Sequence, residues 1–227
     1  MLGDPRFLYA DRADAAHQLA RELLHLKGER PLVLGIPRGG VPIACIVAEV
    51  LGGDVDAIVA AKIRAPGAPE LAIGAVTAGG TRVLAGEVIL GIRASKAHIE
   101  AATAEAHDRA ARREALLRDR VPALPYRGRV VVVCDDGLAT GSTMRAAVRA
   151  AKGGGAARVV VAVPVGSEGA CAALALEGDE VVCPERPEPF YAVGQAYQDF
   201  GEVSDEAMIS ALERARGQRS APAPAAR

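Results

Sequence analysis

The chain has few aromatic residues, no tryptophan and almost no net charge. Lys and Arg together number 27 against 28 Asp and Glu in 227 residues, which gives a formal net charge of −1. Because positive and negative residues are almost equal in number, we do not expect the basic surface of a nucleic-acid-binding protein. An anionic ligand must therefore be held by local groups. The longest apolar stretches, such as residues 130–134 and 159–165, are far shorter than the roughly 20 residues that span a bilayer. We therefore expect neither a nucleic-acid partner nor a membrane helix.

Sequence signals for metal binding and for export are also lacking. The four cysteines form no close pair of the kind that makes a zinc knuckle or a redox CxxC motif, and they stand at Cys45, Cys134, Cys171 and Cys183. Buried, unpaired thiols are expected at these positions. Asp4 and Arg6 interrupt the N-terminus before a signal-peptide core could form, so we expect a cytoplasmic protein.

Short apolar runs alternate with longer helix-like segments, which predicts an α/β fold with a parallel sheet. The expected strands are rich in Val and Ile without alternation, as strands covered on both faces should be, and they fall at residues 31–36, 56–61, 129–134, 158–163 and 180–183. The main helices are expected at residues 13–26, 41–51, 143–152 and 167–176. We predict a single domain over residues 1–216 and a disordered tail over residues 217–227, which are rich in Ala, Pro and Arg.

Two segments do not fit this simple alternation. Residues 63–93 carry many glycines and prolines and predict a mobile loop followed by a small hairpin. Residues 95–120 predict a long helix with Ser95 as its N-cap. Its apolar stripe is narrow, so we expect this helix to lie on the surface, where it is a candidate for contact in a homodimer.

The most informative segment follows the apolar run of residues 130–134. Asp135 and Asp136 come directly after this expected strand, and a turn of small and hydroxylated residues then opens a helix. Ligands bind beyond the carboxyl ends of parallel strands, and the amides of such a turn can bind a phosphate. The residues of this turn are Ala139, Thr140, Gly141, Ser142 and Thr143. Because paired carboxylates repel a phosphate, they are expected to face hydroxyl groups or a metal ion, and the whole pattern predicts a sugar phosphate.

Other phosphate and nucleophile motifs do not match this chain. A Walker loop needs Lys before its hydroxyl residue, but Gly141 is followed directly by Ser142. The dinucleotide fingerprint G-x-G-x-x-G is absent here and at residues 153–155. An esterase elbow at residues 166–169 would need Gly in place of Val165. A turn that only caps a helix is the remaining alternative.

The segment of residues 130–144 resembles the signature with which type I phosphoribosyltransferases bind 5-phosphoribosyl-1-pyrophosphate (PRPP). Four apolar residues, two acids and a three-residue spacer precede Thr-Gly, a small residue and Thr. The resemblance implies a Rossmann-like parallel sheet of about five strands flanked by helices, with a core over residues 31–183, a C-terminal hood over residues 184–200, and an inserted hairpin and long helix. It implies that Asp135 and Asp136 hold the ribose 2- and 3-hydroxyls, directly or through Mg²⁺. It also implies that the turn of residues 139–143 binds the 5-phosphate.

A second match lies directly after the first expected strand. The family binds pyrophosphate on a turn in that position, and the corresponding residues here are Pro37, Arg38, Gly39 and Gly40. Glycines let backbone N–H groups approach the pyrophosphate, and Arg38 can supply a fixed positive charge. Resemblance to the hypoxanthine-guanine branch implies a cis peptide bond between Pro37 and Arg38. Lys62 and Arg64 match basic residues at the root of the family's flexible catalytic loop, which implies a catalytic role for Lys62.

Aromatic residues cluster near the C-terminus. Two of the three Phe and two of the four Tyr lie within residues 187–200, which predicts a surface that stacks on a flat ligand. The segment resembles the hood of the hypoxanthine-guanine enzymes, which implies that Phe190 or Tyr191 stacks on a base and that the backbone of Ala192 or Val193 contacts its edge. At the third spacer position, however, Ala139 matches the adenine branch. The resemblance favours a purine and leaves the base open.

The resemblance implies Mg²⁺-dependent transfer of the 5-phosphoribosyl group from PRPP to a nitrogenous base, with release of pyrophosphate. Asp135, Asp136, Arg38 and Lys62 are the residues implied to take part. A non-catalytic sensor of PRPP or a nucleotide on the same fold is the main alternative. A sugar-phosphate hydrolase is less favoured, because the sequence offers no evident base to activate water.

Overall fold

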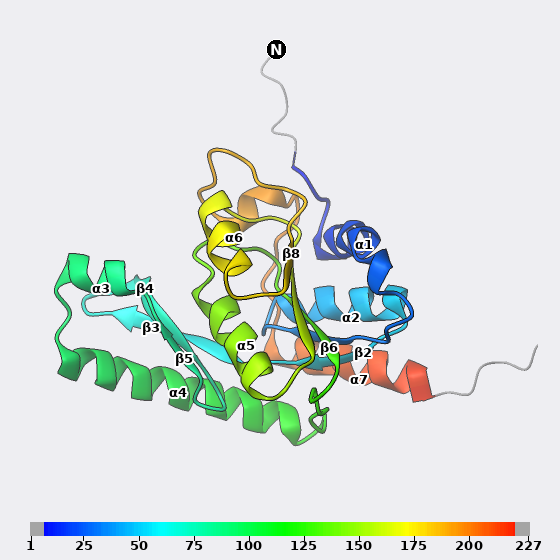
Figure 1. Ribbon diagram of the computed structural model, residues 1–227, viewed down its shortest axis with the longest axis horizontal. Helices are drawn as coiled ribbons and strands as arrows, with labels where there is room; N and C mark the ends of the chain where they lie inside the picture. Colours follow the sequence, from blue (N-terminus) through cyan, green and yellow to red (C-terminus); the bar gives the residue numbers. More distant parts are fainter. Residues whose placement is uncertain (1–6, 221–227) are drawn as a thin grey trace, which may run out of the picture.

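Five strands form a parallel sheet in the order β2-β1-β6-β7-β8. The computed structural model describes residues 7–220 of the chain (Figure 1). The strands of this main sheet are β1 (Leu32–Gly35), β2 (Asp54–Ala57), β6 (Val130–Cys134), β7 (Arg158–Ala162) and β8 (Glu180–Val182). Every neighbouring pair is parallel, so the carboxyl ends of β1 and β6 meet at one edge. The predicted α/β class with a five-stranded parallel sheet is confirmed.

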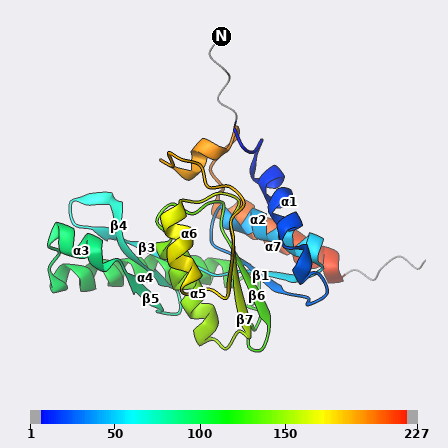
Figure 2. The same ribbon diagram turned by 45° about the horizontal axis from the view of Figure 1, so that its top comes forward.

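Helices cover both faces of the main sheet (Figure 2). They are α1 (Arg12–Glu22), α2 (Gly40–Leu51) and α7 (Asp205–Ser220) on one side, and α5 (Ser142–Gly153) and α6 (Glu168–Ala175) on the other. Successive residues of a strand point to opposite faces, so Val132 packs with the first group and Val131 and Val133 pack with the second. A short 3-10 helix, η1 (Leu24–Leu26), follows α1 within the predicted first helix.

The chain between β2 and β6 builds a second, antiparallel sheet in the order β3-β4-β5. Its strands are β3 (Ala60–Ala65), β4 (Ala68–Thr77) and β5 (Arg82–Leu84), and they are followed by the helices α3 (Gly86–Ile92) and α4 (Lys96–Arg118). The predicted inserted hairpin is confirmed as part of this antiparallel sheet, whereas the loop predicted before it is taken up by β3 and the first part of β4. Ile63 and Ile73 are fully buried and pack with Ala106 of α4, which gives the second sheet a small core of its own.

The predicted strand of residues 56–61 is divided between the two sheets. β2 ends at Ala57 and β3 begins at Ala60, so the chain passes from one sheet to the other within this apolar run. Val59 is buried at the crossing, and its carbonyl oxygen accepts a hydrogen bond from Ala78 N (2.9 Å). The sequence does not reveal the change of sheet, because Ala57 at the end of β2 and Ala60 at the start of β3 are both buried apolar residues.

The long helix α4 forms where the sequence predicts one. The Ser95 hydroxyl oxygen caps it by accepting a hydrogen bond from His98 N (3.2 Å). Its narrow apolar stripe joins two cores, because Ala106 packs on the second sheet while Ala110 and Leu117 pack in the core of the main sheet. Neither α4 nor any other helix within residues 7–220 is long and apolar enough to cross a membrane.

The predicted hood is completed by the N-terminal segment of the chain. Tyr9 N donates a hydrogen bond to Ala196 O (2.9 Å), and Gln198 N donates one to Tyr9 O (2.9 Å). The Tyr9 hydroxyl donates to Pro164 O (2.9 Å), just beyond β7. The hood, which contains the 3-10 helix η2 (Val193–Ala196), is thereby attached to the main sheet.

The last helix, α7, has no counterpart in the sequence prediction. Its buried residues pack in the same core as those of α2, and they are Met208, Ile209 and Leu212. The helix continues to Ser220, so it includes residues 217–220 of the predicted tail. The rest of the predicted tail, residues 221–227, lies outside the described residues.

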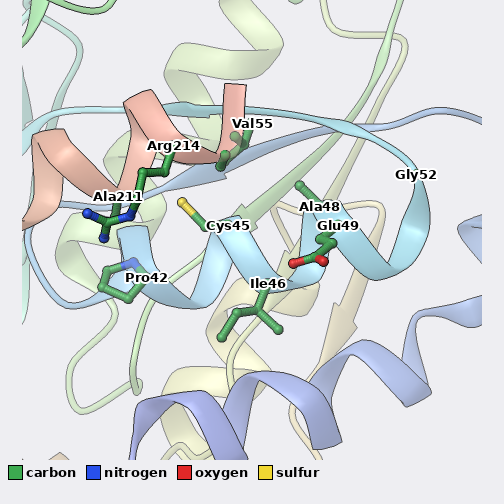
Figure 3. A pocket seen from close by; sticks show the side chains of 10 residues that line it. Pro42, Cys45, Ile46, Ala48, Glu49, Gly52, Val55, Ala211 and Arg214 are labelled. Carbon is green, nitrogen blue, oxygen red and sulfur yellow. The ribbon is translucent and has the colours of Figure 1, made fainter. Parts of the chain in front are cut away.

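A hollow of about 500 Å³ lies between α2 and α7 (Figure 3). Cys45 and Ile46 line it from α2, and Arg214 lines it from α7. Burial raises the pKa of the Cys45 thiol to about 12, so the thiol stays protonated and is a poor nucleophile. None of the site residues predicted from the sequence lines this hollow.

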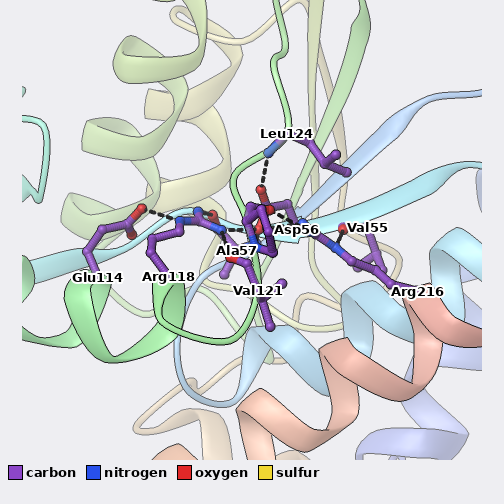
Figure 4. A network of polar contacts seen from close by, with 9 residues as sticks. Val55, Asp56, Ala57, Glu114, Arg118, Val121, Leu124 and Arg216 are labelled. Atoms are coloured by element: carbon purple, nitrogen blue, oxygen red, sulfur yellow. Dashed lines mark hydrogen bonds and ion pairs between the residues drawn. The ribbon is translucent and has the colours of Figure 1, made fainter.

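A buried carboxylate joins the edge strand β2 to α4 and α7 (Figure 4). Asp56 is 2% exposed, and its Oδ1 accepts a hydrogen bond from Arg118 Nη1 (2.7 Å) and lies 2.9 Å from Arg216 Nη2. Its Oδ2 accepts a hydrogen bond from Leu124 N (2.8 Å). Since the two guanidinium groups come from different helices, this one carboxylate ties both helices to the main sheet.

We expect Asp56→Ala to lower the free energy of unfolding by about 3–5 kcal/mol, because the two guanidinium groups lose the carboxylate that they share. Urea denaturation followed by circular dichroism measures the change. The matched control is Glu213→Ala. Glu213 lies on α7, is more exposed than Asp56 and pairs with Arg120, so its loss should lower the free energy of unfolding by only about 0–1 kcal/mol. Equal losses in the two variants would contradict the structural role of Asp56.

Candidate active site

Strand pairing brings two predicted turns to the same edge of the main sheet. Gly35 at the end of β1 lies opposite Cys134 at the end of β6. The turn of residues 37–40 and the acidic pair Asp135 and Asp136 therefore lie side by side. Open parallel sheets bind their ligands at this edge.

The predicted pyrophosphate turn has the expected backbone geometry. The peptide bond between Pro37 and Arg38 is cis, as the resemblance implies. The Arg38 guanidinium forms an ion pair with Glu202, which belongs to the segment that follows the hood. The Glu202 side chain is 77% exposed, so another anion can take its place on Arg38.

Asp136 is held by an arginine that the sequence analysis does not identify. Its Oδ2 accepts a hydrogen bond from Arg12 Nε (2.9 Å) and lies 2.9 Å from Arg12 Nη2. The same oxygen packs against the pyrophosphate turn, where a Cβ on Gly39 would lie only 1.9 Å from it. Glycine is therefore required at this close approach. The Tyr197 hydroxyl donates to Asp136 O (2.6 Å), so the backbone of Asp136 is fixed as well.

The hood and the N-terminal helix meet on Arg12. The Arg12 guanidinium lies over the Phe200 ring, 3.9 Å from its centroid, and Nη1 donates to Gly201 O (2.7 Å). Phe200 in turn stacks on Tyr197, with 4.8 Å between the ring centroids. Tyr197 and Phe200 of the aromatic cluster of the hood thus pack on protein, and Phe190 also packs against the core of the main sheet. Arg12 lies 124 residues before Asp136, so no local sequence pattern could identify it.

Asp135 has a different environment from its neighbour. Its Oδ1 accepts a hydrogen bond from Asp136 N (2.9 Å), and its side chain lines a cavity at the sheet edge. Burial and the charge of Asp136 raise the pKa of Asp135 well above that of an ordinary carboxyl, while the charges of Lys62 and Arg12 act in the opposite direction. The two acids of the predicted pair therefore differ in their surroundings. Asp136 is paired with Arg12, whereas Asp135 faces the cavity.

The predicted phosphate loop opens α5 as expected. Gly141 has a φ of +74°, a left-handed conformation suited to glycine, and Ser142 begins the helix. Among the residues that the structure describes, the backbone N–H groups of Ala139, Thr140 and Gly141 have no backbone acceptor. The Ser167 hydroxyl donates to Ala139 O (2.9 Å) and fixes the loop. Amides left open at a helix N-terminus are suited to binding a phosphate.

A cavity of about 580 Å³ joins these elements. Four of the predicted site residues line it, namely Pro37, Lys62, Asp135 and Thr143. The other lining residues come mainly from β3 and α4. One residue each of the pyrophosphate turn, the acidic pair and the phosphate loop therefore faces the same space as the predicted catalytic lysine, whereas Arg38, Asp136 and residues 139–142 do not line it.

The predicted base-binding residues do not line this cavity. Val193 lies against Gly137, the residue directly after the acidic pair. Phe190 lines a separate hollow beside the start of α6, and the Tyr191 side chain is 84% exposed. Contact between these residues and a base stays a prediction.

The four cysteines form no disulfide in the structure. Cys45, Cys134, Cys171 and Cys183 are unpaired, and all but Cys45 are buried. Within residues 7–220 no group of three or more His, Cys, Asp or Glu side chains could hold a metal ion. A divalent ion at the sheet edge would therefore need ligands from a substrate in addition to Asp135.

Comparison with known proteins agrees with this geometry. The family model of the phosphoribosyl transferase domain matches residues 7–199. The structure of TT1426 from Thermus thermophilus has 42% sequence identity and a TM-score of 0.77, covering 91% of this chain and 98% of that chain. Two Mycobacterium tuberculosis proteins, from strains CDC 1551 / Oshkosh and ATCC 25618 / H37Rv, are 42% identical over 213 residues and have names that place them among the phosphoribosyl transferases. These matches cover 92% of this chain and 47% of each relative, so the chain spans about half the length of the curated relatives.

The fold is that of an α/β protein with a cavity at the carboxyl edge of its parallel sheet. The chain belongs to the phosphoribosyl transferase domain family. The resemblance of residues 130–144 to the signature of type I phosphoribosyltransferases is thereby confirmed.

We expect Arg12→Met to lower the free energy of unfolding by about 1–3 kcal/mol, because the carboxylate of Asp136 loses its charged partner. Urea denaturation measures this change. The control is Arg21→Met, which alters the same residue type at an exposed position of α1 and should stay within about 0.5 kcal/mol of the wild type. If the two variants were equally stable, Arg12 would not have the role assigned to it.

Proposed function

We propose that the chain transfers the 5-phosphoribosyl group of PRPP to a nitrogenous base and releases pyrophosphate. The observation that supports this most is the cavity that Pro37 of the pyrophosphate turn, Asp135 and Thr143 of the phosphate loop line together. PRPP has a phosphate at one end, a diol in the middle and a pyrophosphate at the other end, which matches this set of groups. Membership of the phosphoribosyl transferase domain family supports the same class of reaction.

Each group of residues at this edge of the sheet would bind a different part of the substrate. The open amides of residues 139–141 bind the 5-phosphate, and Asp135 accepts hydrogen bonds from the ribose hydroxyls. Arg38 exchanges Glu202 for the pyrophosphate, to which it can donate two hydrogen bonds. Catalysis is then mainly placement of the substrate and stabilisation of the charge that develops on the leaving group.

A magnesium ion fits this set of donors as part of the substrate complex. Mg²⁺ is usually held by one or two carboxylates together with substrate phosphates, and Asp135 is the candidate carboxylate that lines the cavity. When bound, such an ion neutralises negative charge on phosphate oxygens. The protein's own part is to hold the diol at Asp135 and the pyrophosphate at the turn of residues 37–40.

The acceptor base is a finer part of the proposal. Resemblance of the hood to that of the hypoxanthine-guanine enzymes favours a purine and a role in purine salvage. Val193, which lies against Gly137, places the hood next to the acidic pair. A location in the cytoplasm and a homodimer stay predictions. A PRPP sensor without turnover is the alternative, because the same cavity would serve binding alone.

Asp135→Asn tests the proposal, since it keeps an acceptor for Asp136 N but removes the charge. With PRPP, Mg²⁺ and a panel of purines and pyrimidines, we expect the wild type to release pyrophosphate with at least one base. The variant should be about 10- to 100-fold slower, which corresponds to the loss of a charged hydrogen bond of about 1.5–3 kcal/mol. A pyrophosphate-release assay measures both rates.

The control is Asp108→Asn, which changes an exposed acid on α4 and should not alter the rate. No release with any base, together with PRPP binding seen by calorimetry, would overturn the transferase and favour the sensor. An unchanged rate in Asp135→Asn would show that this carboxylate does not act on the substrate.

A further inference from the structure

One side of α4 presents basic side chains to the cavity that Asp135 lines. Arg109, Arg112 and Arg113 are spaced at i, i+3 and i+4, so they lie on the same side of the helix. All three line the cavity. This spacing is visible in the sequence, but its meaning depends on where the second sheet places the helix.

The cavity carries an excess of positive charge. Lys62 and Arg64 of β3 line it together with the three arginines of α4. The acids that line it are Asp135 and Asp205. Such an excess of cations is suited to a ligand with several negative charges.

Two of the three α4 arginines already have partners in the protein. Arg113 Nε donates to Asp205 Oδ1 (2.9 Å), so this side of the helix already binds one carboxylate. Arg109 Nη2 donates to Lys62 O (3.0 Å), which links α4 to β3. Within residues 7–220, the side chain of Arg112 takes part in no hydrogen bond or ion pair. Its guanidinium is therefore available to a ligand.

We propose that Arg112 binds the pyrophosphate group of PRPP and the pyrophosphate product, an inference that rests on the proposed function. Pro37 of the pyrophosphate turn lines the same cavity, so a pyrophosphate held on the turn also faces α4. Arg112 then supplies a second cation to the leaving group, in addition to Arg38. Arg109 positions Arg112 indirectly, because its bond to Lys62 O holds this part of the helix against β3.

The surroundings favour the pyrophosphate over the acceptor base as the ligand of Arg112. The hood residues predicted to contact the base, Phe190, Tyr191 and Val193, do not line this cavity. A neutral base would gain little from several cations, whereas a pyrophosphate accepts charged hydrogen bonds from guanidinium groups.

The cations also stand on fixed elements of the fold. β3 is paired with β4, and α4 is held by the buried residues Ala106, Ala110 and Leu117. The backbone that carries Arg112 is therefore in place before a substrate binds, which lowers the entropy lost on binding.

The test compares binding of three ligands by calorimetry with Mg²⁺ present, namely PRPP, inorganic pyrophosphate and ribose 5-phosphate. We expect Arg112→Met to weaken binding of PRPP and of pyrophosphate by about tenfold or more and to leave ribose 5-phosphate unchanged. Arg112→Lys keeps the charge and should recover part of the affinity. The matched control is Lys96→Met, which removes an exposed cation at the start of the same helix, outside the cavity.

The outcomes separate this inference from the proposed function. If the wild type bound none of the three ligands, the proposed function and the role of Arg112 would both fail. If the wild type bound PRPP and Arg112→Met bound pyrophosphate equally well, only the role of Arg112 would be wrong. If Arg112→Met weakened binding of all three ligands equally, that role would also be wrong, because the substitution would then affect the cavity as a whole.

Discussion

The ion pair between Arg12 and Asp136 is the contact on which the geometry of the sheet edge depends. Asp136 follows β6, Arg12 belongs to α1, and Phe200 of the hood lies under the guanidinium. Contact with Gly39 adds the pyrophosphate turn to the same cluster. A buried carboxylate is costly without a partner, so this arrangement holds only while all four parts are in place. It leaves Asp135 as the member of the acidic pair that faces the cavity.

The second sheet and α4 build the other side of the same cavity. Arg118 near the end of α4 is held by the buried Asp56, and the middle of the helix packs on two cores. Between these anchors, the side of α4 with Arg112 is directed to the cavity. The second sheet and α4 thus contribute charge to the cavity as well as stability to the fold.

The sequence predicts those parts of the molecule whose pattern is local. The strand, acidic pair and glycine turn of residues 130–144 follow one another directly. The cis bond before Arg38 is expected only from the resemblance to the hypoxanthine-guanine branch. Arg12 could not be predicted, because only the folded chain brings it to Asp136. The division of residues 56–61 between two sheets and the burial of α7 also depend on tertiary packing. The local sequence pattern of each segment is compatible with more than one fold.

A crystal structure of the wild-type protein with PRPP and Mg²⁺ tests the central claim, that the ends of β1 and β6 form a PRPP site. The expected result is a 5-phosphate on the amides of residues 139–143, ribose hydroxyls at Asp135, and a pyrophosphate between the turn of residues 37–40 and Arg112. PRPP bound in the reverse orientation, or in the hollow between α2 and α7 instead, would contradict the claim.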